Sequence, residues 1–219
     1  MKKTILVLVI FTFFFPTLIN AGHDEIKHTN SWLEYLALNQ ARYSYFKGEG
    51  YAHASFNQEV TYTQHPLYQV EEGSAGTRMV FVYLLIDEKV YVIHQEEEFY
   101  SGKNLLTGFI EKAGTNNAKK LMKQFPGRLL FQGPIQKGVS WQTDNRKVEI
   151  IDIGGKIQTA AGYFYNLVNL KRVSDAMVTY EYYAPNIGLV KRVSVFNGDY
   201  RITAELQSFK IDSQEPEIY

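Results

Sequence analysis

The sequence contains no cysteine among its 219 residues. This absence excludes disulfide bonds, lipid attachment through a cysteine, and the common cysteine-containing zinc sites. An excess of charge of one sign is also missing, because 23 Lys and Arg residues balance 23 Asp and Glu residues. A balanced chain has no general affinity for nucleic acid or for anionic membrane surfaces. Stability must therefore come from packing and strand pairing.

The only long hydrophobic run lies at the N-terminus. Lys2 and Lys3 precede an apolar stretch from Thr4 to Phe15, and small Ala21 follows shortly after it. The stretch is too short to cross a bilayer comfortably, since a spanning helix needs about 20 apolar residues. This layout predicts a signal peptide over residues 1–21, cleaved after Ala21, and export to the periplasm or the medium. An uncleaved N-terminal anchor is the alternative, and after cleavage no transmembrane segment is expected.

Residues 22–219 are long enough for a single domain with its own hydrophobic core. Because Lys2 and Lys3 leave with the signal, this mature chain carries a net charge near −2. The 16 Tyr and 14 Phe residues suit sheet faces that are half buried, because their rings are large and apolar. Composition therefore predicts a β-rich domain.

Helical patterns occur in two places. Ser31 and Glu34 have capping-box spacing, and the apolar residues that follow predict a helix over residues 31–42. Between Lys103 and Phe125 the apolar residues predict two short helices, separated by residues 114–117. The lysines of the second helix are Lys119, Lys120 and Lys123. They are typical of a solvated face, and a membrane-seeking helix is the alternative.

The rest of the chain has the composition and turns of antiparallel strands. The predicted elements are a strand over 59–63, and hairpins pairing 78–86 with 89–94, 147–153 with 156–160, 163–173 with 177–183, and 189–196 with 199–210. The hairpin at 147–160 turns at Gly154-Gly155, and the last one turns at Asn197-Gly198. The predicted fold class is α+β, mainly antiparallel β, with a curved meander sheet or open half-barrel covered by a few short helices.

The sequence contains no recognisable catalytic arrangement. It lacks a nucleophile elbow, a phosphate-binding loop and a dinucleotide fingerprint, and its histidines lack metal-ligand spacing. His94 and Glu96 share a strand face, which could orient an imidazole, but a plain exposed pair is the simpler interpretation. The run Glu96 to Glu98 is interpreted as solvated surface rather than a calcium site. We therefore expect no enzyme activity, no metal and no cofactor.

Aromatic side chains on the predicted strands are the candidate ligand-binding residues. They are Phe81, Tyr83, Tyr91, Phe164, Tyr180, Tyr182 and Phe196. On a concave sheet they could bind a lipid or another apolar small molecule. The same rings could instead form a packed core under a covering layer.

Four pieces of the second half resemble a module of exported and lipid-anchored bacterial envelope proteins. They are Pro134 to Gly138 with Trp141, Thr159 to Phe164, Tyr182 to Lys191, and Glu205 to Phe209. Two motifs stand out, Thr-x-Ala-Gly-x-Phe and Tyr-Tyr-Ala-Pro-x-x-Gly-Leu-Val-Lys. The chain departs from the family pattern at Ala160, where proline is usual, and at Asn186, where glycine is usual. Many such proteins carry a lipid-attachment cysteine, which this chain lacks.

The resemblance implies a C-terminal β-meander module over residues 134–210 and an extracytoplasmic location. More remotely, the module is similar to the half-barrels of lipoprotein carriers, which hold acyl chains on a concave sheet. Together with the rings, it predicts a non-enzymatic envelope protein that binds an apolar ligand. A protein–protein interaction or structural module of the envelope is the alternative function, with an envelope protein as its partner.

Overall fold

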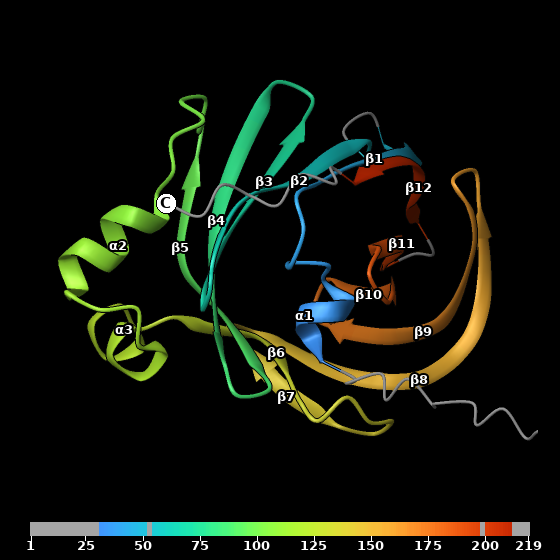
Figure 1. Cartoon of the computed structure of the whole chain (residues 1–219). Helices are drawn as coiled ribbons and strands as arrows, with labels where there is room; N and C mark the ends of the chain where they lie inside the picture. The colour runs from blue at the N-terminus through green and yellow to red at the C-terminus, as the bar shows by residue number, and fades with distance from the viewer. Residues whose placement is uncertain (1–30, 52–53, 198–199, 212–219) are drawn as a thin grey trace, which may run out of the picture.

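The computed structural model describes residues 31–51, 54–197 and 200–211 (Figure 1). The predicted signal peptide over residues 1–21 lies outside these residues, as do Gly198 and Asp199 of the last predicted turn. Within the described ranges no helix is long and apolar enough to cross a membrane.

Twelve antiparallel strands form one sheet, in the order β6-β5-β4-β3-β2-β1-β12-β11-β10-β9-β8-β7. Their bounds are β1 Arg42–Glu49, β2 Phe56–Gln64, β3 Leu67–Ser74, β4 Thr77–Ile86, β5 Lys89–Glu97, β6 Arg128–Gln132, β7 Ser140–Thr143, β8 Arg146–Thr159, β9 Gly162–Val173, β10 Met177–Ala184, β11 Gly188–Phe196 and β12 Arg201–Ile211. Neighbours in the sheet are mostly neighbours in sequence. The exception is β1, which pairs with β12 and so joins the two halves of the meander.

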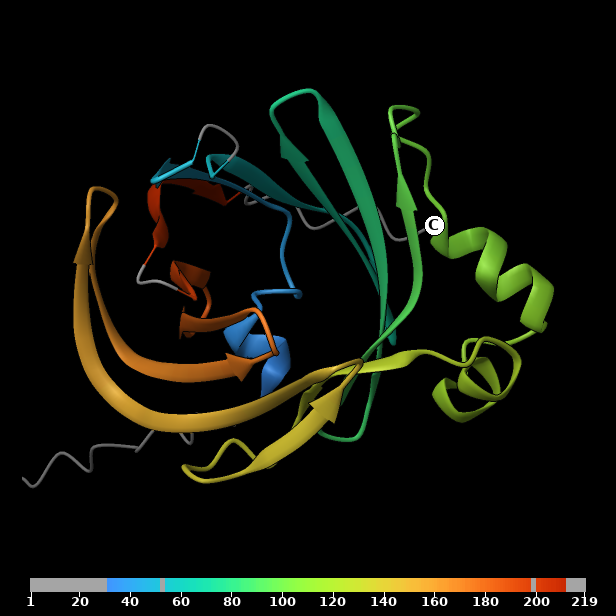
Figure 2. The ribbon, with the colours of Figure 1, turned by 180° about the vertical axis from the view of Figure 1, so that it is seen from behind.

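The sheet curls until its two edge strands, β6 and β7, approach each other (Figures 1 and 2). Side chains connect these edges. Trp141 Nε1 on β7 donates to the Leu130 carbonyl on β6 at 3.3 Å, and Arg128 Nη1 lies 2.6 Å from Asp144 Oδ2. The predicted open half-barrel is therefore a nearly closed barrel-like sheet with an interior.

Strand alternation sorts the side chains between this interior and the outer face. On β1, Arg42, Ser44 and Phe46 are buried, whereas Tyr43 and Tyr45 are exposed. The larger hydrophobic cluster fills much of the interior, and Phe46 stacks on Phe56 there with the ring centroids 4.4 Å apart.

Helix α1 (Trp32–Tyr35) lies inside the ring of strands (Figures 1 and 2). Trp32 is 1% exposed and packs against the rings of Phe131, Trp141 and Tyr183. The predicted helix over 31–42 is much too long, because Ala37 adopts a left-handed φ of 49° and the chain then enters β1. The predicted capping box is also wrong, since the Ser31 side chain makes no capping hydrogen bond.

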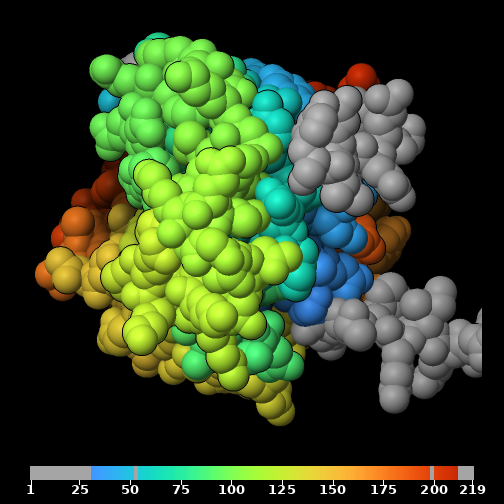
Figure 3. All heavy atoms as spheres, turned by 60° about the vertical axis from the view of Figure 1, so that its left-hand side comes forward, coloured from blue at the N-terminus to red at the C-terminus, as the bar shows by residue number. Residues whose placement is uncertain are grey.

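Helices α2 (Leu106–Ala113) and α3 (Ala118–Gln124) form where helices are predicted, but on the outer face of the sheet. Leu106 and Leu121 pack against Val82 and Leu84 of β4, whose neighbours Phe81 and Tyr83 point inward. Figure 3 shows the two helices covering this outer surface. Short helices therefore do cover the sheet, with α2 and α3 on its outer face, and only α1 enters the interior.

A buried glutamine fixes the segment before α2 to the sheet. Gln69 of β3 accepts a hydrogen bond from the Leu105 amide at 2.9 Å and donates to the Lys103 carbonyl at 3.0 Å. At α3 the Asn117 side chain caps the helix, because it accepts a hydrogen bond from the Lys120 amide at 3.2 Å. The three lysines of α3 are exposed.

The predicted hairpin at 147–160 is wrong. Residues Arg146–Thr159 form one strand, β8, which pairs with β9 along its length. Gly154 and Gly155 adopt φ values of 98° and 75°. The pairing with β9 nevertheless continues, because Gly154 pairs with Leu167 and Lys156 pairs with Tyr165. The two glycines therefore lie within a long curved strand, and the chain reverses only after Thr159.

The other predicted hairpins are confirmed. β4 pairs with β5 around Asp87-Glu88, β9 pairs with β10 around residues 174–176, and β11 pairs with β12. The strand predicted over 59–63 is the central part of β2, which ends at Gln64 before Pro66.

Candidate functional site

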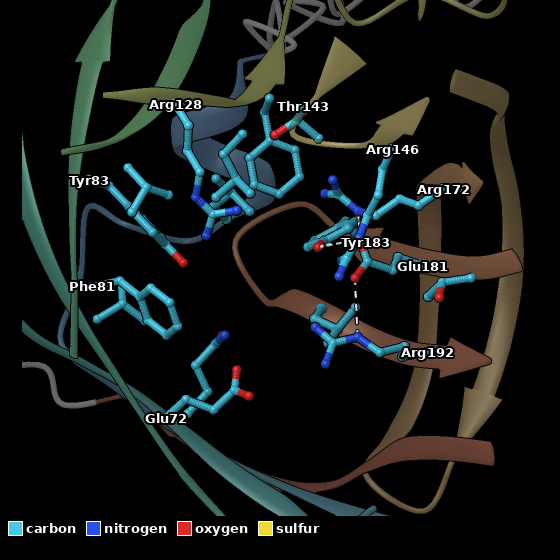
Figure 4. A pocket seen from close by; sticks show the side chains of 18 of the residues that line it. Glu72, Phe81, Tyr83, Arg128, Thr143, Arg146, Arg172, Glu181, Tyr183 and Arg192 are labelled. Atoms are coloured by element: carbon cyan, nitrogen blue, oxygen red, sulfur yellow. Dashed lines mark hydrogen bonds and ion pairs between the residues drawn. The ribbon is translucent and has the colours of Figure 1, made fainter. Parts of the chain in front are cut away.

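A cavity of about 360 Å³ lies within the barrel-like sheet, and every strand except β12 contributes to its lining. One wall carries Glu72, Phe81 and Tyr83 of β3 and β4 (Figure 4). The facing wall carries charged side chains of β9, β10 and β11. Arg128 and Arg146 reach toward the space between the walls from the side where β6 and β7 meet (Figure 4).

Glu181 is the centre of the charged wall. It is 5% exposed, and its carboxylate accepts from Arg172 Nε at 2.7 Å and from Arg192 Nε at 3.1 Å. The Tyr183 hydroxyl donates to the same carboxylate at 3.1 Å. Strand pairing places these groups together, because Glu181 lies opposite Arg192 on β11 and next to β9, which carries Arg172.

The two guanidinium groups determine the ionisation of Glu181. Burial alone would raise the pKa of this carboxyl, but Arg172 and Arg192 outweigh burial and lower its pKa to about 2. Burial would lower the pKa of both arginines, and the Glu181 carboxylate raises it above the usual value instead. All three side chains therefore stay charged at neutral pH.

Aromatic rings lie against the guanidinium groups of the same two arginines. The guanidinium of Arg172 lies 5.1 Å from the centroid of Phe131, and that of Arg192 lies 5.2 Å from the centroid of Phe56. These cation–π contacts fix the planes of both guanidinium groups. The charged wall is thus held by packing as well as by ion pairing.

Arg42 of β1 is buried at the cavity and has no carboxylate partner among the described residues. Its Nη2 donates to Gln58 Oε1 at 3.0 Å, whereas Nε and Nη1 are buried without a hydrogen-bond partner there. Burial lowers the pKa of Arg42 to about 10, and the electrostatic influence of Tyr183 and Tyr83 opposes this shift only in part.

Glu72 faces this wall from β3. Burial raises the pKa of the Glu72 carboxyl, and the positive charge of Arg192 opposes that rise. Burial likewise raises the pKa values of Tyr83 and Tyr183, so both phenols remain neutral hydrogen-bonding groups.

Two of the seven predicted ligand-binding aromatics, Phe81 and Tyr83, line the cavity. Phe164 is buried and packs against Phe209 at 6.2 Å, and Phe196 lies 5.9 Å from Tyr200. Tyr91, Tyr180 and Tyr182 are half buried and do not line this cavity. The structure therefore places only one pair of the predicted residues in this cavity.

The arginines and acids of the cavity are the residues that sequence reasoning missed. Arg172, Glu181 and Arg192 lie at alternate positions of predicted strands, where charge ordinarily indicates the solvent side. One feature of the sequence could have indicated them. Glu181 alternates with Thr179 and Tyr183 along its strand and lies opposite Arg192 in the next hairpin, which places opposite charges on one face of the sheet.

The predicted pair of His94 and Glu96 lies away from the cavity. His94 Nε2 is 3.3 Å from Glu96 Oε2, with the two side chains 34% and 51% exposed. The neighbouring Glu97 and Glu98 are exposed as well. This geometry is that of a surface pair.

No protein-family model and no curated protein matches the sequence. The solved structures that are similar to it include two bacterial proteins. A predicted lipoprotein from Parabacteroides distasonis is 13% identical with a TM-score of 0.41, covering 81% of this chain and 98% of that one. A predicted exported protein with a YmcC-like fold from Bacteroides fragilis is 14% identical with a TM-score of 0.39, covering 78% of this chain and 94% of that one.

Proposed function

We propose that this chain is an exported, non-catalytic binding protein that holds a small ligand inside its barrel-like sheet. The observation that carries the proposal is the interior cavity of about 360 Å³. Its volume lies within the range of about 300–1,000 Å³ that is typical of small-molecule sites. The N-terminal signal pattern supports export of the binding domain.

The lining suits a ligand with both apolar and polar parts. Phe81, Leu130 and Met177 supply apolar surface, whereas Glu181 and its arginines supply fixed charge. Such a mixture of apolar walls and a few oriented polar groups is typical of binding pockets. Because the charged groups already hold one another in place, a ligand would meet a preorganised site.

Binding rather than catalysis fits the chemistry of the charged wall. The pKa of Glu181 is about 2, so this carboxylate is a poor general base and cannot act as an acid at neutral pH. Arg172 and Arg192 remain protonated beside it. These groups can orient a ligand and have little capacity to exchange protons with it.

Native mass spectrometry of the full chain purified from its own host tests this proposal. We expect a bound small molecule in the wild-type protein and its loss in Ser194→Phe, which fills the cavity from β11. The matched control is Val193→Phe on the same strand, whose neighbours Arg192 and Ser194 point inward, so its own side chain points outward. Equal occupancy in both variants, or no bound molecule in a folded wild-type protein, would contradict the proposal.

A further inference from the structure

The charges that line the cavity are unequal in number. Five arginines line it, namely Arg42, Arg128, Arg146, Arg172 and Arg192, against the three acids Glu72, Asp144 and Glu181. Glu181 is shared by Arg172 and Arg192, and Asp144 pairs with Arg128. The interior therefore keeps a positive excess even when Glu72 is ionised.

Two arginines account for this excess. Arg146 lines the cavity, and its side chain makes no hydrogen bond or ion pair within the described part of the chain. Arg42 is 3% exposed, and two of its three guanidinium nitrogens have no hydrogen-bond partner there. A buried guanidinium without a counter-charge is costly, because it has lost its hydration without gaining a partner.

The apolar residues limit what can supply the missing negative charge. Phe81, Leu130 and Met177 share the cavity with the arginines, so a small hydrated ion would leave this surface in contact with water. A molecule with an acidic group on an apolar body would satisfy both parts of the lining at once.

We infer that the ligand is an amphiphilic acid, whose carboxylate or phosphate group lies among Arg42, Arg128 and Arg146 while its apolar body lies against Phe81 and Leu130. This inference rests on the proposed function and specifies the ligand class. Guanidinium groups favour both kinds of acid, since their donors match two oxygens at a time.

Two fluorescent probes that share one apolar skeleton test the inference. Anilinonaphthalene sulfonate carries an acidic group, and phenylnaphthylamine is the same molecule without it. We expect the purified full chain to bind the sulfonate with one-to-one stoichiometry and at least about tenfold more tightly than the neutral probe. Ser194→Phe is expected to abolish binding of both probes.

Arginine variants assign the effect to the cavity. Arg146→Gln is expected to weaken sulfonate binding about tenfold and to leave phenylnaphthylamine binding unchanged. Arg146 is a solvent-exposed residue at the cavity rather than a core residue, so this variant is expected to fold. Arg201→Gln is the matched control, because Arg201 is an exposed arginine of β12 that does not line the cavity.

Competition distinguishes an amphiphilic acid from a free ion. Decanoate is expected to displace the sulfonate probe at concentrations where acetate and inorganic phosphate do not. Displacement by phosphate alone would overturn the inference in favour of a simple ion site.

Equal binding of the charged and neutral probes, with no effect of Arg146→Gln, would overturn the inference that the ligand is acidic while leaving the proposed function intact. Failure of both probes to bind would count against the proposed function itself.

Discussion

Gly188 leaves room for the Arg42 side chain. A Cβ atom at position 188 would overlap with Nη1 of Arg42, and the backbone there has a φ of +90° that favours glycine. The start of β11 and the buried guanidinium of β1 therefore depend on each other, although 146 positions separate them in the sequence.

Gly188→Ala is expected to lower the free energy of unfolding by more than backbone strain alone explains. Strain at such a φ costs on the order of 1–3 kcal/mol. Gly76→Ala provides the control, because Gly76 has the same φ of +90° and open space around it. Denaturant unfolding of both variants gives the difference, which measures the displacement of Arg42. Equal losses of stability would show that Arg42 moves aside freely.

Glu181→Gln is expected to lower the free energy of unfolding by about 3–5 kcal/mol, because it leaves Arg172 buried without its counter-charge. The control is Glu205→Gln, which breaks the more exposed pair with Lys191 and should cost at most about 1 kcal/mol. Guanidinium unfolding curves would measure both losses. A loss for Glu181→Gln no greater than that of the control would contradict a central role for this ion pair.

The low pKa of Glu181 predicts that the fold loses stability as the pH becomes acidic. The folded-state pKa of about 2 lies below the ordinary value of 4.5, so the ionised carboxylate stabilises the fold. This contribution is complete above pH 4.5 and is lost as the pH falls toward 2. Carbon NMR of the Glu181 carboxyl is expected to show titration near pH 2, and a midpoint near 4.5 would contradict the ion-paired geometry.

The raised pKa of Glu72 predicts the opposite dependence of stability on pH. Burial raises the pKa of this carboxyl, so its contribution to stability is present below the ordinary pKa and is lost as the pH rises through the folded-state pKa. Glu72→Gln is therefore expected to be more stable than the wild type at neutral pH and to bind the sulfonate probe more tightly. Unfolding and probe titrations at pH 7 measure these two effects. Lower stability of the variant would show that attraction to Arg192 outweighs the cost of burial.

Much of the sheet was predictable because its turns are local. Asp87-Glu88 and the hairpin around residues 174–176 carry enough turn and alternation signal to place β4, β5, β9 and β10. Gly154-Gly155 has the same turn signal but lies within β8, since the paired residues of β9 extend the ladder past it. Local composition does not distinguish a turn from a curved strand when pairing with a neighbour decides the outcome.

The site was harder to predict because closure of the sheet is a long-range property. On an open sheet, Arg172 and Glu181 would be expected on the solvent-exposed face, and Phe81 on the concave face that binds the ligand. Closure puts all three inside, where ion pairing replaces hydration. The position of α1 inside the ring likewise depends on contacts between Trp32 and rings of β6, β7 and β10.

The crystal structure of the full chain with bound anilinonaphthalene sulfonate is the most direct test of the central claim that the interior is a ligand site. We predict the naphthalene rings between Phe81 and Leu130, with the sulfonate within hydrogen-bond distance of Arg42, Arg128 or Arg146. A probe bound only on the outer face, with the interior cavity unchanged, would contradict the account.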